Sequence, residues 1–319
     1  MKKIVTFILL TVLLVTGCGS QNQETKPQDK NAQGKKLHVV TTMFAAYDFA
    51  RSVGGNKIQV TMLVPPGSDI HAYEPTPKDI AGLQKCDILV YVGGESDAWV
   101  EKILASLDNK KMQKIKMIDI VKPVEEEVKK GMTIHEEPGH REEKEYDEHV
   151  WTSPANAKLI AAALRDAFSA KDGANKAAYA KNCESFMGKL TELDKKFKAV
   201  VAGSKRKVVV FGDRFPLRYF VDAYGLDYFA AFPGCAHNTE ASASTIAFLI
   251  NKVKTAKIPV VFHIELSNEK IAKAICEATG AKMLQFNTCH NVPKGDFDKG
   301  VTYLDLMNKN LAALKEALN

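Results

Sequence analysis

Three histidines and one aspartate stand where predicted strands end or predicted helices begin: His71, His149, His290 and Asp213. Open α/β sheets bind ligands beyond the carboxyl ends of their strands, so these four positions could face one cleft. Neutral imidazoles together with a carboxylate suit Zn²⁺, and also Mn²⁺ or Fe²⁺. The spacing of these residues therefore predicts a transition-metal site, although each histidine alone would be weak support for one.

The elements that position these residues alternate between strand and helix patterns along the chain. Strands are predicted over residues 37–42, 58–64, 87–92 and 115–120, and again over 207–211, 228–232, 260–265 and 282–286. Helices fit between them, with Thr76-Pro77-Lys78-Asp79 forming a capping-box start and a last helix over 303–318. Such alternation predicts parallel sheets with crossover helices, hence two α/β lobes.

One long helical pattern separates the two series of strands. It begins after Asp172-Gly173, ends at Gly203 and repeats apolar residues at helical spacing. We therefore predict an N-terminal lobe over 36–171, a stiff linking helix over 172–203 and a C-terminal lobe over 204–319. The ligand site is expected in the cleft between the lobes.

The first residues have the pattern of an export signal. Lys2 and Lys3 precede an apolar run over 4–15, which is too short for a permanent membrane span. The following Val15-Thr16-Gly17-Cys18 resembles a bacterial lipobox. We predict a signal peptide over 1–17, a lipid on Cys18 that anchors the chain to the outer face of the cytoplasmic membrane, and a flexible polar tether over 18–35.

Charge and cysteine content narrow the class further. The formal net charge of +6 comes from interspersed charges, so we expect a solvated surface and no nucleic-acid partner. We also expect a monomer. Five cysteines besides Cys18 lack CxxC spacing, which argues against a thiolate zinc cluster. Cys235 and Cys289 follow two strands of the second lobe, and we hypothesise a disulfide between them.

Several motifs together resemble the zinc- and manganese-binding receptors of bacterial ABC importers. The first covers 67–75 around His71, and the second is His149-Val150-Trp151 followed by Ser153-Pro154 and Asn156-Ala157. Further matches are Tyr219-Phe220 with Tyr224-Gly225-Leu226, Glu240-Ala241-Ser242, residues 262–265, and residues 303–307 with Asn310-Leu311. The resemblance implies two α/β lobes joined by a rigid helix, a metal between them, and delivery of that metal to a membrane permease.

The resemblance carries His71 and His149 over as ligands but fails at the third position. Counted back from Tyr224, that position is Arg214, which cannot ligate a cation. Asp213 is one residue away, and the fourth, acidic position falls near 288–290, where we predict that His290 supplies a ligand. Glu240 and Glu265 are alternatives, or could pair with Arg214. Three histidines favour zinc, and a carboxylate in place of one favours manganese.

The favoured function is a receptor without catalytic activity. An exported zinc hydrolase using the three histidines, with Glu265 or Asp213 as base, is a competing class, but no nucleophile motif accompanies it. A receptor for an anionic solute held by Arg214 is another.

The charged segment 124–148 contains His135 and His140, which could collect zinc weakly or simply be solvated. Its resemblance to a metalloprotease motif fails because the histidines are five apart and Pro138 intervenes.

Overall fold

The computed structural model describes residues 36–133, 146–234 and 240–319. The predicted signal peptide, the tether and Cys18 lie outside these residues, as do His135, His140 and Cys235. In the described part of the chain, no helix combines the length and the apolar character that crossing a membrane requires.

The N-terminal lobe contains a four-stranded parallel sheet in the order β2-β1-β3-β4. Its strands are β1 (Leu37–Thr41), β2 (Ile58–Met62), β3 (Ile88–Tyr91) and β4 (Gln113–Lys116). Its helices are α1 (Phe44–Gly54), α2 (Pro77–Leu83), α3 (Ala98–Ser106) and α4 (Pro154–Lys171). The 3-10 turns are η1 (Gly55–Lys57), η2 (Ile70–Ala72), η3 (Glu95–Asp97), η4 (Met117–Ile120) and η5 (Val150–Thr152).

The C-terminal lobe repeats this order in a second parallel sheet, β6-β5-β7-β8. Its strands are β5 (Val208–Phe215), β6 (Asp227–Pro233), β7 (Val260–His263) and β8 (Lys282–Gln285). Its helices are α6 (Arg218–Tyr224), α7 (Ala243–Thr255), α8 (Lys270–Thr279) and α9 (Lys294–Asp298). The predicted fold class, two parallel-sheet α/β lobes with one long helix between them, is confirmed.

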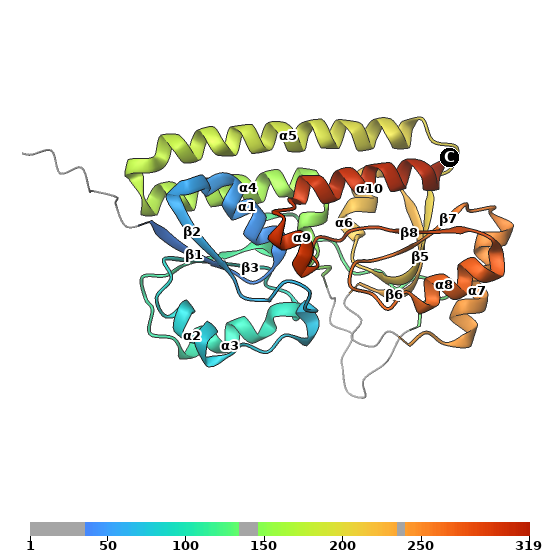
Figure 1. The fold of residues 1–319 in the computed structure, drawn as a ribbon, viewed down its shortest axis with the longest axis horizontal. Coiled ribbons are helices and arrows are strands. Elements are labelled where there is room, and N and C mark those ends of the chain that lie inside the picture. The colour runs from blue at the N-terminus through green and yellow to red at the C-terminus, as the bar shows by residue number, and fades with distance from the viewer. Residues whose placement is uncertain (1–35, 134–145, 235–239) are drawn as a thin grey trace, which may run out of the picture. The chain divides into compact units, whose positions relative to one another are not determined.

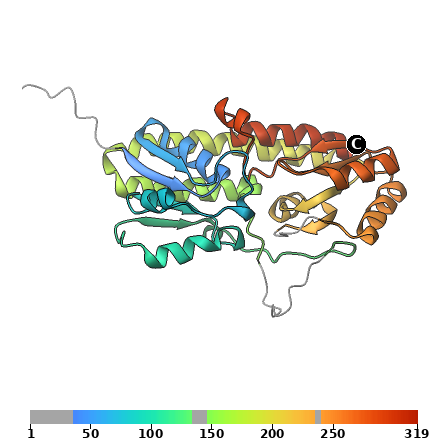
Figure 2. The same ribbon diagram turned by 60° about the horizontal axis from the view of Figure 1, so that its bottom comes forward.

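Two long helices connect the lobes (Figures 1 and 2). After the turn η6 (Gly173–Asn175), helix α5 (Lys176–Ala202) packs its Phe186 against Phe49 of α1 and its Phe197 against Phe220 of α6. Helix α10 (Tyr303–Leu318) lies along α5 and also contacts the second sheet. One buried apolar cluster therefore runs through both lobes, and we expect it to stabilise their relative position.

Local sequence signals set several element ends as expected. Thr76 and Asp79 form the predicted capping box of α2, each satisfying a backbone N–H of the other. Thr302 and Asp305 form a second box at α10, whose bounds match the predicted helix. In both cases the deciding contacts lie within four residues, which is why a sequence pattern could locate them.

Two strand boundaries differ from the prediction. The fourth strand begins at Gln113 and gives way to the 3-10 turn η4 at Met117, because its ladder with β3 ends at Lys116. Strand β5 continues to Phe215, since pairing with β6 resumes beyond an irregularity after Phe211. The sequence predicts Asp213 and Arg214 after this strand, but the structure has both residues within β5.

Candidate metal-binding site

His149 is held by the aspartate two residues before it. The Asp147 carboxylate accepts hydrogen bonds from the His149 backbone N–H at 2.8 Å and from its ring Nδ1 at 3.1 Å. Both side chains are buried. Burial alone would lower the pKa of His149, but the carboxylates of Asp147 and Glu148 outweigh it and raise the pKa. With its proton on Nδ1, the neutral ring offers the Nε2 lone pair, and none of the described residues forms a hydrogen bond with this atom.

His290 lies in the loop that follows β8, close to His149. The centroids of the two rings are 4.7 Å apart and the planes are nearly perpendicular. Trp151 packs against the His290 ring at 4.9 Å, and its indole N–H donates to the Thr288 carbonyl at 2.8 Å. Residues before and after the long helix α5 therefore meet at one point, as the sequence predicted for His149 and His290.

The segment that carries His71 is attached to the loop that carries His290. The Asn291 side-chain amide donates to the carbonyls of Pro65 and Ser68 at 2.7 and 2.8 Å. The Gly67 N–H donates to the Val292 carbonyl at 2.8 Å. His71 itself lies in turn η2, but its side chain is outside the part that the structure describes. These bonds hold the backbone around His71 beside the loop of His290.

The alternative carboxylates are engaged elsewhere. Asp213 accepts hydrogen bonds from the backbone N–H groups of Arg214 at 2.9 Å and Ile264 at 3.2 Å. Glu265 accepts from the N–H and the hydroxyl of Thr288. Burial raises the pKa of the Glu265 carboxyl, and these hydrogen bonds oppose the increase.

Arg214 and Glu240 complete the set of residues considered from the sequence. Arg214 forms an ion pair with Asp69 of the N-terminal lobe at 3.2 Å, so it bridges the lobes at the site. Glu240 is exposed. Arg214 and His290 line a small cavity of about 30 Å³, with room for an ion and little more. Among the side chains that the structure describes, no group of three or more His, Cys, Asp or Glu is arranged to hold a metal ion.

The hypothesised Cys235–Cys289 disulfide is wrong for this structure. Cys289 is a free thiol, and burial raises its pKa well above the ordinary value. Its backbone is left-handed, with φ at 63°, which turns the chain between Thr288 and His290 and points the thiol into the core. Cys235 lies outside the described residues. Cys86 and Cys183 are buried among apolar residues, whereas Cys276 is only partly buried.

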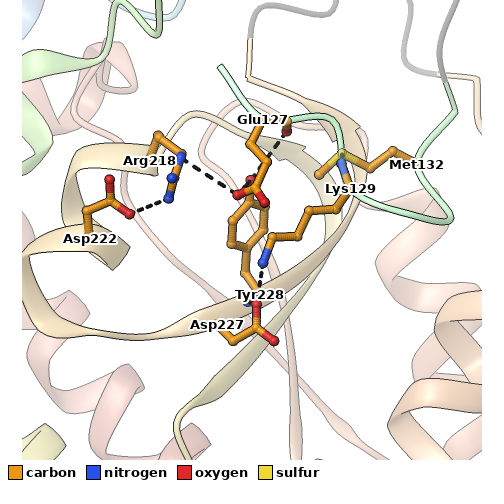
Figure 3. Close-up of polar contacts among 7 residues, drawn as sticks. All are labelled: Glu127, Lys129, Met132, Arg218, Asp222, Asp227 and Tyr228. Atoms are coloured by element: carbon orange, nitrogen blue, oxygen red, sulfur yellow. Dashed lines mark hydrogen bonds and ion pairs between the residues drawn. The ribbon is translucent and has the colours of Figure 1, made fainter. Parts of the chain in front are cut away.

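A segment missed by the sequence patterns ties the lobes together. Residues 124–133, called the strap here, leave the N-terminal lobe and lie on the second one (Figure 3). Lys129 forms an ion pair with Asp227 and lies 4.3 Å from the centroid of the Tyr228 ring. Glu127 and Arg218 are 3.7 Å apart. The strap has no periodic pattern, so only its charged side chains could have suggested these partners.

The strap also supports the segment around His149. The Tyr219 hydroxyl of α6 donates to the Asp147 carbonyl at 3.0 Å and accepts from the Val124 N–H at 3.2 Å. The Asp147 N–H donates in turn to the Val124 carbonyl at 2.9 Å. The carboxylate that orients His149 is therefore fixed through the strap to the opposite lobe.

Gly131 tests how closely the strap must fit. Its φ is +95°, and a Cβ there would lie 2.2 Å from the Phe248 ring of α7. We expect Gly131→Ala to lower the free energy of unfolding by about 2 kcal/mol, because left-handed backbone and steric overlap both oppose alanine. Gly188→Ala in α5, where a Cβ meets nothing within 4 Å, should raise it by about 0.5–1 kcal/mol. Urea denaturation of both variants measures the difference, and equal effects would contradict a tight fit of the strap.

Comparison with known proteins places the chain in a family. Residues 39–317 match the model of ZnuA, the periplasmic component A of zinc-uptake complexes. The high-affinity zinc uptake system protein ZnuA of Bacillus subtilis is 32% identical over 309 residues, covering 96% of this chain and 94% of that protein. The zinc-binding lipoprotein AdcA of Streptococcus pneumoniae is 32% identical over 318 residues, or 99% of this chain, which spans only 61% of AdcA.

Solved structures agree with the sequence matches. The Zn(II)-bound ZnuA-like domain of Streptococcus pneumoniae AdcA has a TM-score of 0.74 and 31% identity, covering 89% of this chain and 99% of that domain. The metal-dependent lipoprotein YcdH of Bacillus subtilis has a TM-score of 0.72 and 30% identity, with the same coverage. The two-lobed fold and the segments that carry His149 and His290 are consistent with these matches. The chain belongs to the ZnuA family of periplasmic components of zinc-uptake complexes.

Proposed function

We propose that the chain is an exported, lipid-anchored receptor that binds Zn²⁺ between its two lobes and delivers it to the permease of an ABC importer. The observation that carries the proposal is the contact between His149, which precedes α5 in the sequence, and His290, which follows it. The centroids of the two rings are 4.7 Å apart. The zinc-related names of the relatives from Bacillus subtilis and Streptococcus pneumoniae support zinc as the cargo.

The proposed ligands are His71, His149 and His290. His149 and His290 each have a hydrogen-bonding partner at Nδ1, the arrangement that fixes a metal-binding imidazole in place. Three neutral imidazoles favour Zn²⁺ over the competing cargo Mn²⁺, which prefers oxygen ligands. The metal ion would be transported and released, so it is cargo and not a resident cofactor.

The proposal includes the remaining features expected from the sequence. A signal peptide over 1–17, a lipid on Cys18 and a tether over 18–35 would hold a monomeric receptor at the outer face of the cytoplasmic membrane. The division into lobes over 36–171 and 204–319, with a linking helix over 172–203, belongs to the same proposal. The name of the pneumococcal relative, a zinc-binding lipoprotein, supports the anchor.

The competing functions are less well supported. A hydrolase would need a carboxylate ready to act as a base, yet Asp213 and Glu265 accept hydrogen bonds from backbone N–H groups. An anion receptor would use the charge of Arg214, which is paired with Asp69. We therefore propose a binding protein without catalytic activity.

The test is zinc affinity, measured by competition with a chromophoric chelator. His71→Ala, His149→Ala and His290→Ala should each weaken zinc binding at least about a hundredfold, because each removes a direct ligand. Replacing a residue that only orients a ligand already lowers metal affinity about ten- to a hundredfold. His38→Ala is the matched control, because His38 is in β1 and bonds to Thr61. Unchanged affinity in the His149 and His290 variants would refute the site. Repeating the competition with Mn²⁺ distinguishes the two cargoes.

A further inference from the structure

A buried chain of hydrogen bonds lies behind His290. The Thr288 backbone N–H donates to one oxygen of the Glu265 carboxylate at 2.7 Å. The Thr288 hydroxyl lies 2.5 Å from the other oxygen and 2.8 Å from Nδ1 of His290. Glu265 and Thr288 are 7% and 1% exposed, so water does not compete with these bonds. The sequence suggested Glu265 as a ligand, as a partner of Arg214 or as the base of a hydrolase, and not as a residue that orients His290.

The number of hydrogens available decides which group donates in each of these hydrogen bonds. A hydroxyl has one hydrogen, and an O–H···O distance of 2.5 Å is typical of a bond to an ionised carboxylate. Once that hydrogen points to Glu265, the Thr288 oxygen can only accept from the His290 ring. The ring proton is then on Nδ1, and Nε2 has the lone pair that a metal requires.

We propose that Glu265 is a positioning residue for zinc binding, which acts through the Thr288 hydroxyl to place the ring proton of His290 on Nδ1. This inference rests on the proposed role of His290 as a ligand. Asp147 does the same for His149 by direct contact at 3.1 Å, whereas Glu265 needs the hydroxyl between them. Both imidazoles thereby have their ring proton on Nδ1 before the metal arrives.

The loop keeps its shape independently of this chain of bonds. Trp151 donates to the Thr288 carbonyl at 2.8 Å. Asn310 accepts from the Asn287 N–H at 2.7 Å and donates to the Asn287 carbonyl at 2.7 Å. Substitutions at Glu265 or in the Thr288 hydroxyl should therefore change the ring proton of His290 more than the backbone of the loop.

Three variants distinguish an effect on the ring proton of His290 from an effect on side-chain packing. Thr288→Val removes the hydroxyl at nearly constant volume, and Thr288→Ser keeps it. Glu265→Gln keeps the shape but replaces one of the two carboxylate oxygens with an NH₂ group, so the N–H and the hydroxyl of Thr288 can no longer each donate to a separate oxygen. If the glutamine NH₂ turns to the Thr288 oxygen, the hydroxyl donates to Nδ1 and the ring proton moves to Nε2, the wrong nitrogen for zinc.

The first measurement is the ¹⁵N NMR spectrum of the histidine side chains in the full, metal-free chain, with His290 assigned by the signal lost in His290→Gln. We expect the Nδ1–H tautomer in the wild type and in Thr288→Ser, and its loss in Thr288→Val and Glu265→Gln. The second is competition for Zn²⁺ itself. Affinity should fall about ten- to a hundredfold in Thr288→Val and Glu265→Gln, as for other groups that orient a ligand, and Thr288→Ser should restore it.

The two measurements fail for different reasons. An Nε2–H tautomer of His290 in the wild type, or an unchanged tautomer in Glu265→Gln, overturns the inference whatever the zinc affinity. A correct tautomer together with unchanged affinity in His290→Ala leaves the bond chain in place but refutes His290 as a ligand. Loss of affinity in Thr288→Ser equal to that in Thr288→Val also overturns the inference, because it would assign the effect to packing.

Discussion

Zinc at a thousand times its dissociation constant is expected to stabilise the folded chain by about 4 kcal/mol relative to the metal-free form. Only the folded chain brings His149 and His290 together, from residues 141 positions apart in the sequence (290 − 149), so the unfolded chain should bind zinc far more weakly. For a chain of this size the gain corresponds to a rise of roughly 10 °C in Tm, measured by calorimetry with and without zinc.

The control for this experiment is His149→Ala under the same conditions. A site weakened a hundredfold is stabilised by only about 1.4 kcal/mol at the same zinc concentration, so the variant should show at most about a third of the wild-type shift. A chelator should return the wild type to its metal-free Tm. An equal shift in both proteins would mean that zinc stabilises the chain elsewhere, and would count against the proposed site. The partly buried control residue His38 should be replaceable without losing the shift.

Asn310→Ala is expected to cost about 3 kcal/mol in the free energy of unfolding, because it leaves buried polar groups of Asn287 without partners. Asn310 is fully buried in α10 and bonds to the N–H, the carbonyl and the side-chain amide of Asn287. These bonds fix the end of β8 just before the Thr288–His290 turn. We therefore expect weaker zinc binding as well as lower stability.

Asn308→Ala is the matched control for this substitution. Asn308 lies on the exposed side of the same helix, where its amide donates to the Leu304 carbonyl. Its loss should change the free energy of unfolding by less than about 0.5 kcal/mol, as is usual for surface positions. Urea denaturation of both variants provides the comparison. Similar losses would show that the Asn310–Asn287 bonds contribute little beyond helix propensity.

The sequence predicted those parts of the fold that depend on nearby residues. The strand and helix alternation, the Thr76 capping box and the bounds of α10 follow from periodicity and from contacts within one helical turn. The pairing of Lys129 with Asp227 depends on residues 98 positions apart, and no local pattern announces it. The same holds for the irregularity in β5 that places Asp213 inside the strand and turns its carboxylate to the Ile264 N–H.

The proposed ligands could be chosen from the sequence because single motifs carry them, whereas the groups that hydrogen-bond to them come from distant parts of the chain. His149 and His290 could be chosen because each follows or precedes a recognisable element. The role of Glu265 could not, since it depends on a hydroxyl that stands between it and His290. The left-handed conformation of Cys289 was equally hidden, because cysteine has no preference for it.

The shared strand order of the two sheets has a consequence for how such a protein can evolve. Each lobe has its second strand at one edge, then the first, third and fourth, so the halves are alike in architecture. The proposed ligands are not alike: two come from the first half, His71 between α1 and α2 and His149 just before α4, and one comes from the loop after β8 in the second. Duplicating either half would therefore reproduce the scaffold without the ligand set. One half can therefore change its contribution to the site while the other stays constant, and the Arg214 side chain in the second half is compatible with the proposed receptor function.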